Sequence, residues 1–130
     1  MERTKHESKD LEKRLVSFAV KILDLAQEIE NTTKGRHLSN QIIRSGTSSA
    51  LNYGEAKSAE SRKDFIHKVR VVLKELRETE MALNIIQQGR ISANEDDLEF
   101  LIKENNELIA IFIASVNTAL KNQIIASSKK

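Results

Sequence analysis

The chain has 130 residues, which is the length of a single domain that can bury a hydrophobic core. It contains no proline, only four glycines and no cysteine, so long helices are favoured over short strands, and disulfide and thiolate chemistry are excluded. The formal net charge is +2, yet residues 1–90 hold 17 Lys and Arg against 13 Asp and Glu, whereas residues 91–130 hold 4 against 6. We therefore expect the two parts of the chain to produce fields of opposite sign.

Targeting and membrane signals are not expected in this sequence. The first ten residues are charged throughout and lack the apolar centre of a signal peptide. No apolar run approaches the ~18 residues that a membrane-spanning helix needs. These features predict a cytoplasmic protein that makes no membrane contact.

A helical period begins near the N-terminus. Ser8 is a candidate N-cap, and the apolar residues after it recur at steps of four and three, which predicts a helix over about residues 9–30. Three further apolar residues, Val16, Val20 and Leu23, widen the apolar arc beyond what one buried side needs. Part of this arc should face a second partner. The expected core stripe is Leu11, Leu15, Phe18, Ile22, Leu25 and Ile29.

A second helix is predicted over about residues 36–57, and its apolar stripe has an unusual centre. Only small side chains occupy two turns of it, which lets a neighbouring backbone come close. These residues are Ser45, Gly46, Ser49 and Ala50. The other side is polar and would need hydrogen-bonding partners if it were covered. We expect this helix to be surrounded by other helices or subunits.

Two charged residues of the second helix are candidate interface residues. Arg44 and Glu55 lie about three turns apart on one face, too far to pair with each other. Across a subunit interface they would meet each other's copies or other charges. The small-residue seam beside them favours this role over that of two isolated surface charges.

Two longer helices complete the chain. One is predicted over about residues 61–88, with Ser61 as its N-cap and Gly89 as its C′ residue. The other is predicted over about residues 95–121, capped by Asn94, after which the end should fray. The expected core stripes are Phe65, Val69, Val72, Leu76, Thr79, Leu83 and Ile86, and then Leu98, Ile102, Asn105, Ile109, Phe112, Val116 and Ala119.

Four long helices joined by short loops predict an all-α, antiparallel, up-down four-helix bundle that forms one domain over residues 1–130 with frayed ends. The first and fourth helices carry more apolar surface than one bundle needs. Self-association is the simplest explanation, and packing across a wide intramolecular interface is the alternative.

Short motifs in the second and third helices are similar to those of a known family. They are Gln41, Arg44 and Ser45, then Ser49, Asn52, Gly54 and Glu55, then Ser61 to Phe65 and Lys74 to Glu78. Over about residues 11–120 the chain resembles the small four-helix bundle proteins called 23S ribosomal RNA intervening sequence proteins, which themselves resemble accessory proteins of diversity-generating retroelements. The resemblance implies a ring-shaped homopentamer, with nucleic-acid binding as the suspected role.

The third helix also carries basic residues on the side opposite its core stripe. Each pair of like charges one turn apart lowers the stability of an isolated helix by ~0.2–0.5 kcal/mol, so another interaction should offset this loss. A phosphate backbone of RNA or DNA would do so by releasing counterions. The candidate nucleic-acid-binding residues are Lys63, His67, Arg70, Lys74 and Arg77.

The alternative for these residues is a solvated helix face, neutralised by Glu60 and Glu78 or by an acidic patch of another subunit. Because the chain has only five aromatic residues, most of them on core stripes, no platform for stacking bases is expected. Any binding should therefore read the nucleic-acid backbone or its shape.

No residue pattern predicts catalysis, a metal site or a cofactor. Asp64 and His67 have a metal-binding spacing but lack the further inward carboxylates that a di-metal bundle needs. Ser45, Ser48 and Ser49 have no histidine or carboxylate within a turn. We expect a non-enzymatic binding protein. The competing interpretation is a structural or adaptor protein that binds another protein, such as a nucleic-acid enzyme.

Overall fold

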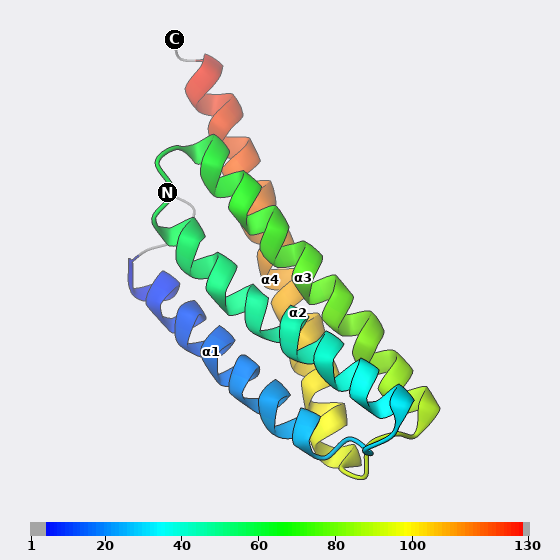
Figure 1. Ribbon diagram of the computed structural model, residues 1–130. Helices are drawn as coiled ribbons and strands as arrows, with labels where there is room; N and C mark the ends of the chain where they lie inside the picture. Colours follow the sequence, from blue (N-terminus) through cyan, green and yellow to red (C-terminus); the bar gives the residue numbers. More distant parts are fainter. Residues whose placement is uncertain (1–4, 129–130) are drawn as a thin grey trace.

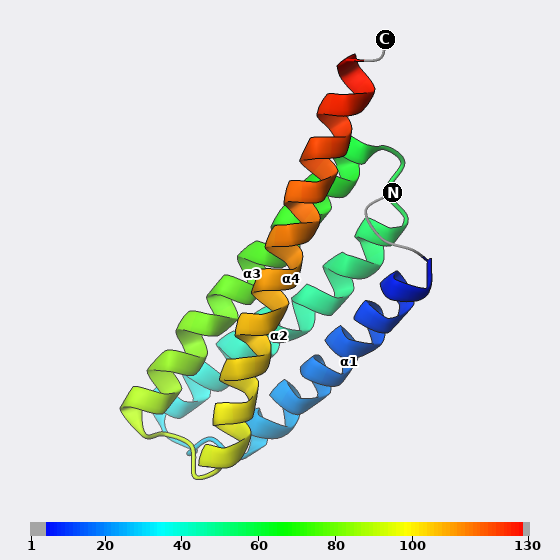
Figure 2. The same cartoon turned by 180° about the vertical axis from the view of Figure 1, so that it is seen from behind.

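The computed structural model describes residues 5–128, which form four helices joined by short loops (Figure 1). These are α1 (Lys5–Gln27), α2 (Thr33–Lys57), α3 (Arg62–Gly89) and α4 (Glu95–Ser128). Each helix runs antiparallel to the one before it, and α4 also packs on α1 (Figures 1 and 2). The predicted all-α four-helix bundle is confirmed. The described residues do not include 1–4 and 129–130. Residues 1–4 belong to the N-terminal segment in which no signal peptide is expected.

Side chains cap three of the helix starts. Thr32 Oγ1 accepts a hydrogen bond from the Gly35 N–H at 3.1 Å, and Ser61 Oγ accepts one from the Asp64 N–H at 3.0 Å. Asn94 Oδ1 accepts one from the N–H of Asp97 at 3.1 Å. The predicted caps Ser61 and Asn94 are therefore confirmed. α1 begins at Lys5, so Ser8 lies within the helix and not at the predicted N-terminal boundary.

Two helix ends differ from the sequence-based prediction because the loops bond to each other. α1 ends at Gln27, before the predicted residue 30, since the Glu30 N–H donates to the Ile91 carbonyl at 3.0 Å and Ile29 forms an isolated β-bridge with Ser92. At the end of α3, Arg90 and not Gly89 takes the left-handed conformation, with φ of 53°. This turn places Ile91 in the core, where only 4% of it is exposed.

α4 continues as a helix beyond its predicted end near residue 121, up to Ser128. Residues 121–128 contain no glycine or proline, and Arg62 Nη1 donates to the Asn122 carbonyl at 3.2 Å. The last turns of α4 project beyond the turn between α2 and α3 (Figures 1 and 2). By its length and composition, α4 could cross a membrane. The sequence-based prediction had excluded any membrane-spanning helix. The core helix of a soluble protein passes the same test.

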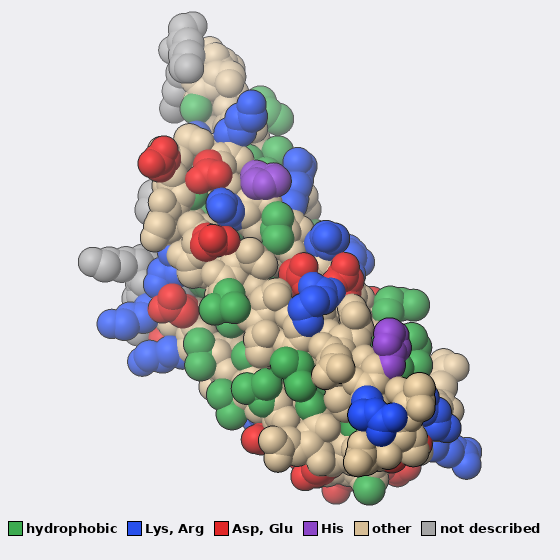
Figure 3. Space-filling model, in the orientation of Figure 1, with side chains coloured by type: hydrophobic (Ala, Val, Ile, Leu, Met, Phe, Trp, Pro, Cys, Tyr) green, Lys and Arg blue, Asp and Glu red, His purple; other side chains and the backbone are tan. Residues whose placement is uncertain are grey.

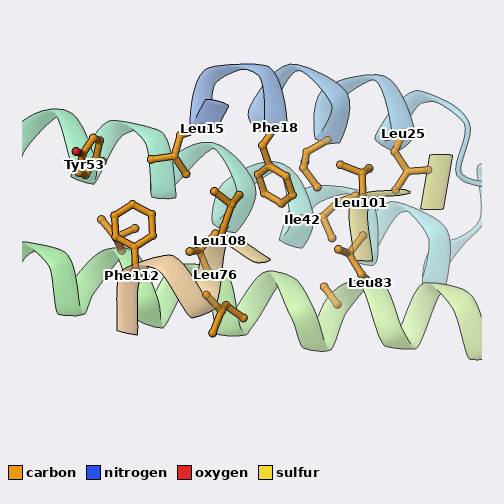
Figure 4. Close-up of a cluster of buried hydrophobic side chains, with 14 of the residues drawn as sticks. Leu15, Phe18, Leu25, Ile42, Tyr53, Leu76, Leu83, Leu101, Leu108 and Phe112 are labelled. Atoms are coloured by element: carbon orange, nitrogen blue, oxygen red, sulfur yellow. The ribbon is translucent and has the colours of Figure 1, made fainter. Parts of the chain in front are cut away.

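The core runs along the centre of the bundle (Figure 4). All six residues of the predicted α1 stripe are buried, and the Tyr53 and Phe112 rings meet edge to face, with centroids 5.3 Å apart. Phe65 is only partly buried, and Ile66 takes its expected place in the core. The reason is the direction of the α3–α4 contact, because Arg62, one turn before Ile66, reaches α4.

The small-residue seam of α2 holds α1 and α3 close. A Cβ atom on Gly46 would lie 2.9 Å from Ile22 Cγ2 of α1, closer than side-chain contacts allow. On the other side of α2, the hydroxyl oxygens of Ser45 and Thr79 lie 2.8 Å apart in a fully buried contact with α3. The expectation that α2 packs closely on its neighbours is met within the chain.

Two alanine substitutions in α2 test this close approach. Gly46→Ala should lower the free energy of unfolding by about 1 kcal/mol, because overpacking against Ile22 outweighs the gain in helix propensity. Gly54→Ala is the matched control, since its Cβ would meet nothing within 4 Å. It should raise the free energy of unfolding by about 0.5–1 kcal/mol. Urea unfolding measures both, and equal stabilisation by the two changes would contradict the close packing.

Candidate nucleic-acid interface

The five predicted basic residues of α3 form one exposed line on the side of the helix that faces away from the core. We call them the basic line: Lys63, His67, Arg70, Lys74 and Arg77. All five are exposed, and the residues of α3 between them supply the buried side. Figure 3 shows basic side chains along the α3 edge of the molecule. The exposure of all five residues agrees with the helical period of the sequence.

Little negative charge neutralises the basic line from within the chain. In the described part of the chain, Lys63, Arg70 and Arg77 make no ion pair, and Lys74 has only Glu78, whose Oε1 lies 4.0 Å from Lys74 Nζ. Lys68 lies to one side of the line and pairs with Glu55 of α2 at 3.8 Å. The line therefore keeps most of its positive charge available to an external anion.

Arg44 of α2 binds two acidic side chains of α3. It donates from Nη1 to Glu75 Oε2 at 3.1 Å and from Nη2 to Glu78. Hydrogen bonding to Glu78 raises the pKa of Arg44, with the charges of Glu75 and Glu78 adding to the effect. Because Glu75 is only 7% exposed, this contact neutralises a carboxylate that is almost fully buried.

The predicted interface residues thus both bind α3 of their own chain. Arg44 pairs with Glu75 and Glu78, and Glu55 pairs with Lys68. Their sequence separation gave no sign of these partners, because which side of α3 meets α2 depends on how the two helices are rotated against each other. A role between subunits stays a prediction for both residues.

Beside the basic line lies a shallow hollow of about 470 Å³, which the sequence pattern did not reveal. Its lining combines cations with apolar groups: Arg70, Leu73, Lys74, Arg77, Glu78 and Met81. Met81 is 60% exposed, and Ile85, one turn further along α3, is 52% exposed. Met81 and Ile85 follow Arg77 at steps of four residues. The helical period of the sequence could therefore have predicted that both are exposed beside the basic line.

The remaining candidate residues have structural contacts. Ser49 Oγ donates to the Gly46 carbonyl at 2.9 Å, and Ser45 contacts Thr79, which agrees with a packing role for these serines. Asp64 and His67 have no third ligand, since no group of three His, Asp or Glu side chains within residues 5–128 is placed to hold a metal ion.

Comparisons with known proteins agree with the fold. The sequence model of the 23S rRNA-intervening sequence protein family matches residues 7–114. A crystal structure of a protein of unknown function from the S23 ribosomal protein family of Bacteroides thetaiotaomicron superposes with a TM-score of 0.76. The two sequences are 33% identical, and the match covers 85% of this chain and 97% of the other. No curated protein matches the chain.

Removing Arg44 tests whether its main role lies within the chain. Arg44→Met should lower the free energy of unfolding by about 2 kcal/mol, because Glu75 would stay buried without its cation. The double variant Arg44→Met, Glu75→Gln should recover at least half of this loss in urea unfolding. If Arg44→Met leaves stability unchanged but reduces the size of an assembly, Arg44 acts between subunits instead.

Proposed function

Because the chain belongs to the 23S rRNA-intervening sequence protein family, we propose that it is a cytoplasmic, non-enzymatic protein that binds the phosphate backbone of RNA or DNA. The contact surface is the basic line of α3, and the protein acts as a homo-oligomer. Family resemblance favours a ring of five copies. No metal or cofactor takes part in this binding.

The observation that carries the proposal is the exposure of the basic line together with the scarcity of acidic partners. Lys63 and Arg77 are 14 residues apart, which corresponds to about 21 Å along the helix axis. This length matches about six phosphates of one strand of a duplex. Cations that are exposed, in line and not paired within the described chain can each contact a phosphate and release counterions.

The aromatic residues support backbone contacts over base contacts. Tyr53, Phe18 and Phe112 are buried, Phe65 of α3 packs against the core, and Phe100 lies on α4 beneath the ammonium group of Lys21. None of them lies beside the basic line to stack on a base. We therefore propose binding that depends weakly on sequence and strongly on salt.

Oligomerisation would increase the affinity of this surface. A single short line of cations binds a polyanion weakly at physiological salt, whereas several lines on one particle make the later contacts intramolecular. A homo-oligomer would therefore bind a long nucleic acid more tightly than the isolated chain.

A second candidate function is that of an adaptor for another protein, such as a nucleic-acid enzyme. The exposed Met81 and Ile85 favour it, because apolar side chains next to cations suit a protein surface better than a phosphate backbone. This candidate predicts negligible nucleic-acid affinity at physiological salt.

Charge reversal of the basic line tests the proposed function. The variant carries Lys63→Glu, Arg70→Glu, Lys74→Glu and Arg77→Glu. Titration of fluorescently labelled structured RNA and duplex DNA should show wild-type binding that weakens about 100-fold between ~50 and ~200 mM salt, as expected for about four phosphate contacts. The variant should show no binding at either salt concentration.

A matched control reverses the same amount of charge at exposed lysines outside α3, namely Lys9, Lys13, Lys103 and Lys121. It should keep most of the wild-type affinity. Equal losses in the two variants would mean that net charge alone determines binding. A wild-type protein that is inert at low salt would refute nucleic-acid binding and favour the adaptor function.

A further inference from the structure

The hollow on the outer side of α3 shares half of its lining with the basic line. We call it the α3 hollow; it has a volume of about 470 Å³ and is lined by Arg70, Leu73, Lys74, Arg77, Glu78 and Met81. The shared residues are the cations Arg70, Lys74 and Arg77. A strand whose phosphates contact the basic line must therefore pass over the α3 hollow.

The rest of the lining does not suit a phosphate group. Leu73 is partly buried against the core, and Met81 is 60% exposed, so the hollow contains apolar surface. At the α3 edge of the molecule in Figure 3, hydrophobic side chains lie beside basic and acidic ones. The carboxylate of Glu78 would repel a phosphate. The α3 hollow thus offers surface that the backbone of a nucleic acid would leave unused.

Glu78 supplies a hydrogen-bond acceptor to the hollow. Its Oε2 accepts from Nη2 of Arg44, whereas its Oε1 lies 4.0 Å from Lys74 Nζ, which is beyond hydrogen-bond distance. The side chain is 33% exposed. Because both oxygens of a carboxylate accept hydrogen bonds, Oε1 can accept one from an N–H group of a ligand. Arg44 holds the carboxylate in place for this contact.

The other groups of the hollow can contact a flat ring. Within residues 5–128, Arg70 and Arg77 make no ion pair, so both guanidinium planes are available. Guanidinium planes stack on unpaired bases in RNA-binding proteins. A methionine thioether also makes favourable contacts with aromatic rings, and Met81 lies one turn beyond Arg77. An aromatic ligand therefore finds partners here although the hollow has no aromatic side chain.

We propose that the α3 hollow binds one unpaired nucleobase of the strand whose phosphates contact the basic line. This inference rests on the proposed function and deepens it, because it names nucleic acids with unpaired nucleotides as the preferred ligands. A base is flat, has two apolar faces and carries N–H donors on its edge. It therefore matches the apolar groups, the arginines and the free oxygen of Glu78 at the same time.

The hollow distinguishes structures more than sequences. In a continuous duplex the bases are stacked and their N–H donors are paired, so only a bulge, a loop or a single-stranded end can supply a base. Each of the four bases has an N–H donor, so the preference is for an unpaired position and not for a particular base. An acidic protein segment fits the hollow less well, because its carboxylates would face Glu78.

Three RNA hairpins test this inference. The first carries a single unpaired 2-aminopurine in its stem, the second is fully paired, and the third has an abasic nucleotide at the unpaired position. At ~50 mM salt the wild type should bind the first about fivefold more tightly than the others, which is the lower end of what one stacked base contributes. The fluorescence of 2-aminopurine should rise, because the base leaves the RNA stack.

Met81→Ala should remove the preference for the unpaired base. It should change the affinity for the paired hairpin by less than about twofold, because the phosphate contacts of the basic line supply that affinity. Ile85→Ala is the matched control, since Ile85 is 52% exposed one turn further along α3 and does not line the hollow. It should keep the wild-type preference.

Glu78→Gln should change the affinities for the hairpins in opposite directions. Loss of a negative charge should tighten binding of the paired hairpin. Because Arg44 would bind the remaining side-chain oxygen, an amide N–H₂ would replace the acceptor in the hollow, and the preference for the unpaired base should fall. If Glu78 acts through its charge alone, all three hairpins should gain affinity equally, which would contradict its contact with the base.

The outcomes separate this inference from the proposed function. Equal affinities for the three hairpins, with binding that still weakens with salt, would overturn the inference and leave the proposed function intact. A preference that survives Met81→Ala would overturn the assignment to the α3 hollow. A wild type that binds none of the hairpins at low salt would refute both proposals, and if it binds polyglutamate instead, the cations belong to a site for an acidic protein.

Discussion

The close approach of α1 to α2 at Gly46 is the constraint on which the rest of the bundle depends. With no side chain at that position, Ile22 fills the space against the α2 backbone, and the Ser45–Thr79 contact holds α3 on the opposite side. α1 and α3 therefore both pack closely on α2. At these contacts α2 has small side chains, which bury little apolar area. The large side chains of α1, α3 and α4 form one core with Ile42 and Tyr53 of α2, and this core includes the contact between Phe112 and Tyr53.

The same packing separates the charges of α3. Because α2 lies against one side of that helix, Arg44 reaches Glu75 and Glu78, and two carboxylates that would neutralise neighbouring cations are bound by an arginine from another helix. A buried carboxylate paired in this way contributes little net stability compared with an apolar residue, but it is costly to leave alone. Its consequence for the surface is electrostatic, since the exposed side of α3 is left predominantly positive.

The sequence predicted those features that repeat with the helical period. It located the four helices, the α1 stripe and the exposed basic line, because apolar and charged spacing reports which side of a helix is buried. The prediction failed where two neighbouring residues could fill the same core position. It also failed where contacts between distant parts of the chain determine the local structure. Phe65 and Ile66 fit the stripe equally well, the left-handed Arg90 depends on the burial of Ile91, and the end of α4 has no local stop signal. The partners of Arg44 depend on helix rotation, which no spacing records.

The two ends of the bundle are unlike, which follows from the bond between Glu30 and Ile91. At that end the two loops are tied to each other by their backbones, whereas at the other end α4 extends alone past the turn between α2 and α3 (Figure 2). Local opening is easiest where backbone contacts are fewest. We therefore expect local opening to be easier at the end where α4 projects than at the end where the two loops are bonded. Lys63 lies near the end at which α4 projects and Arg77 about half way toward the end at which the loops are bonded, so the proposed contact surface would open more easily at one end than at the other.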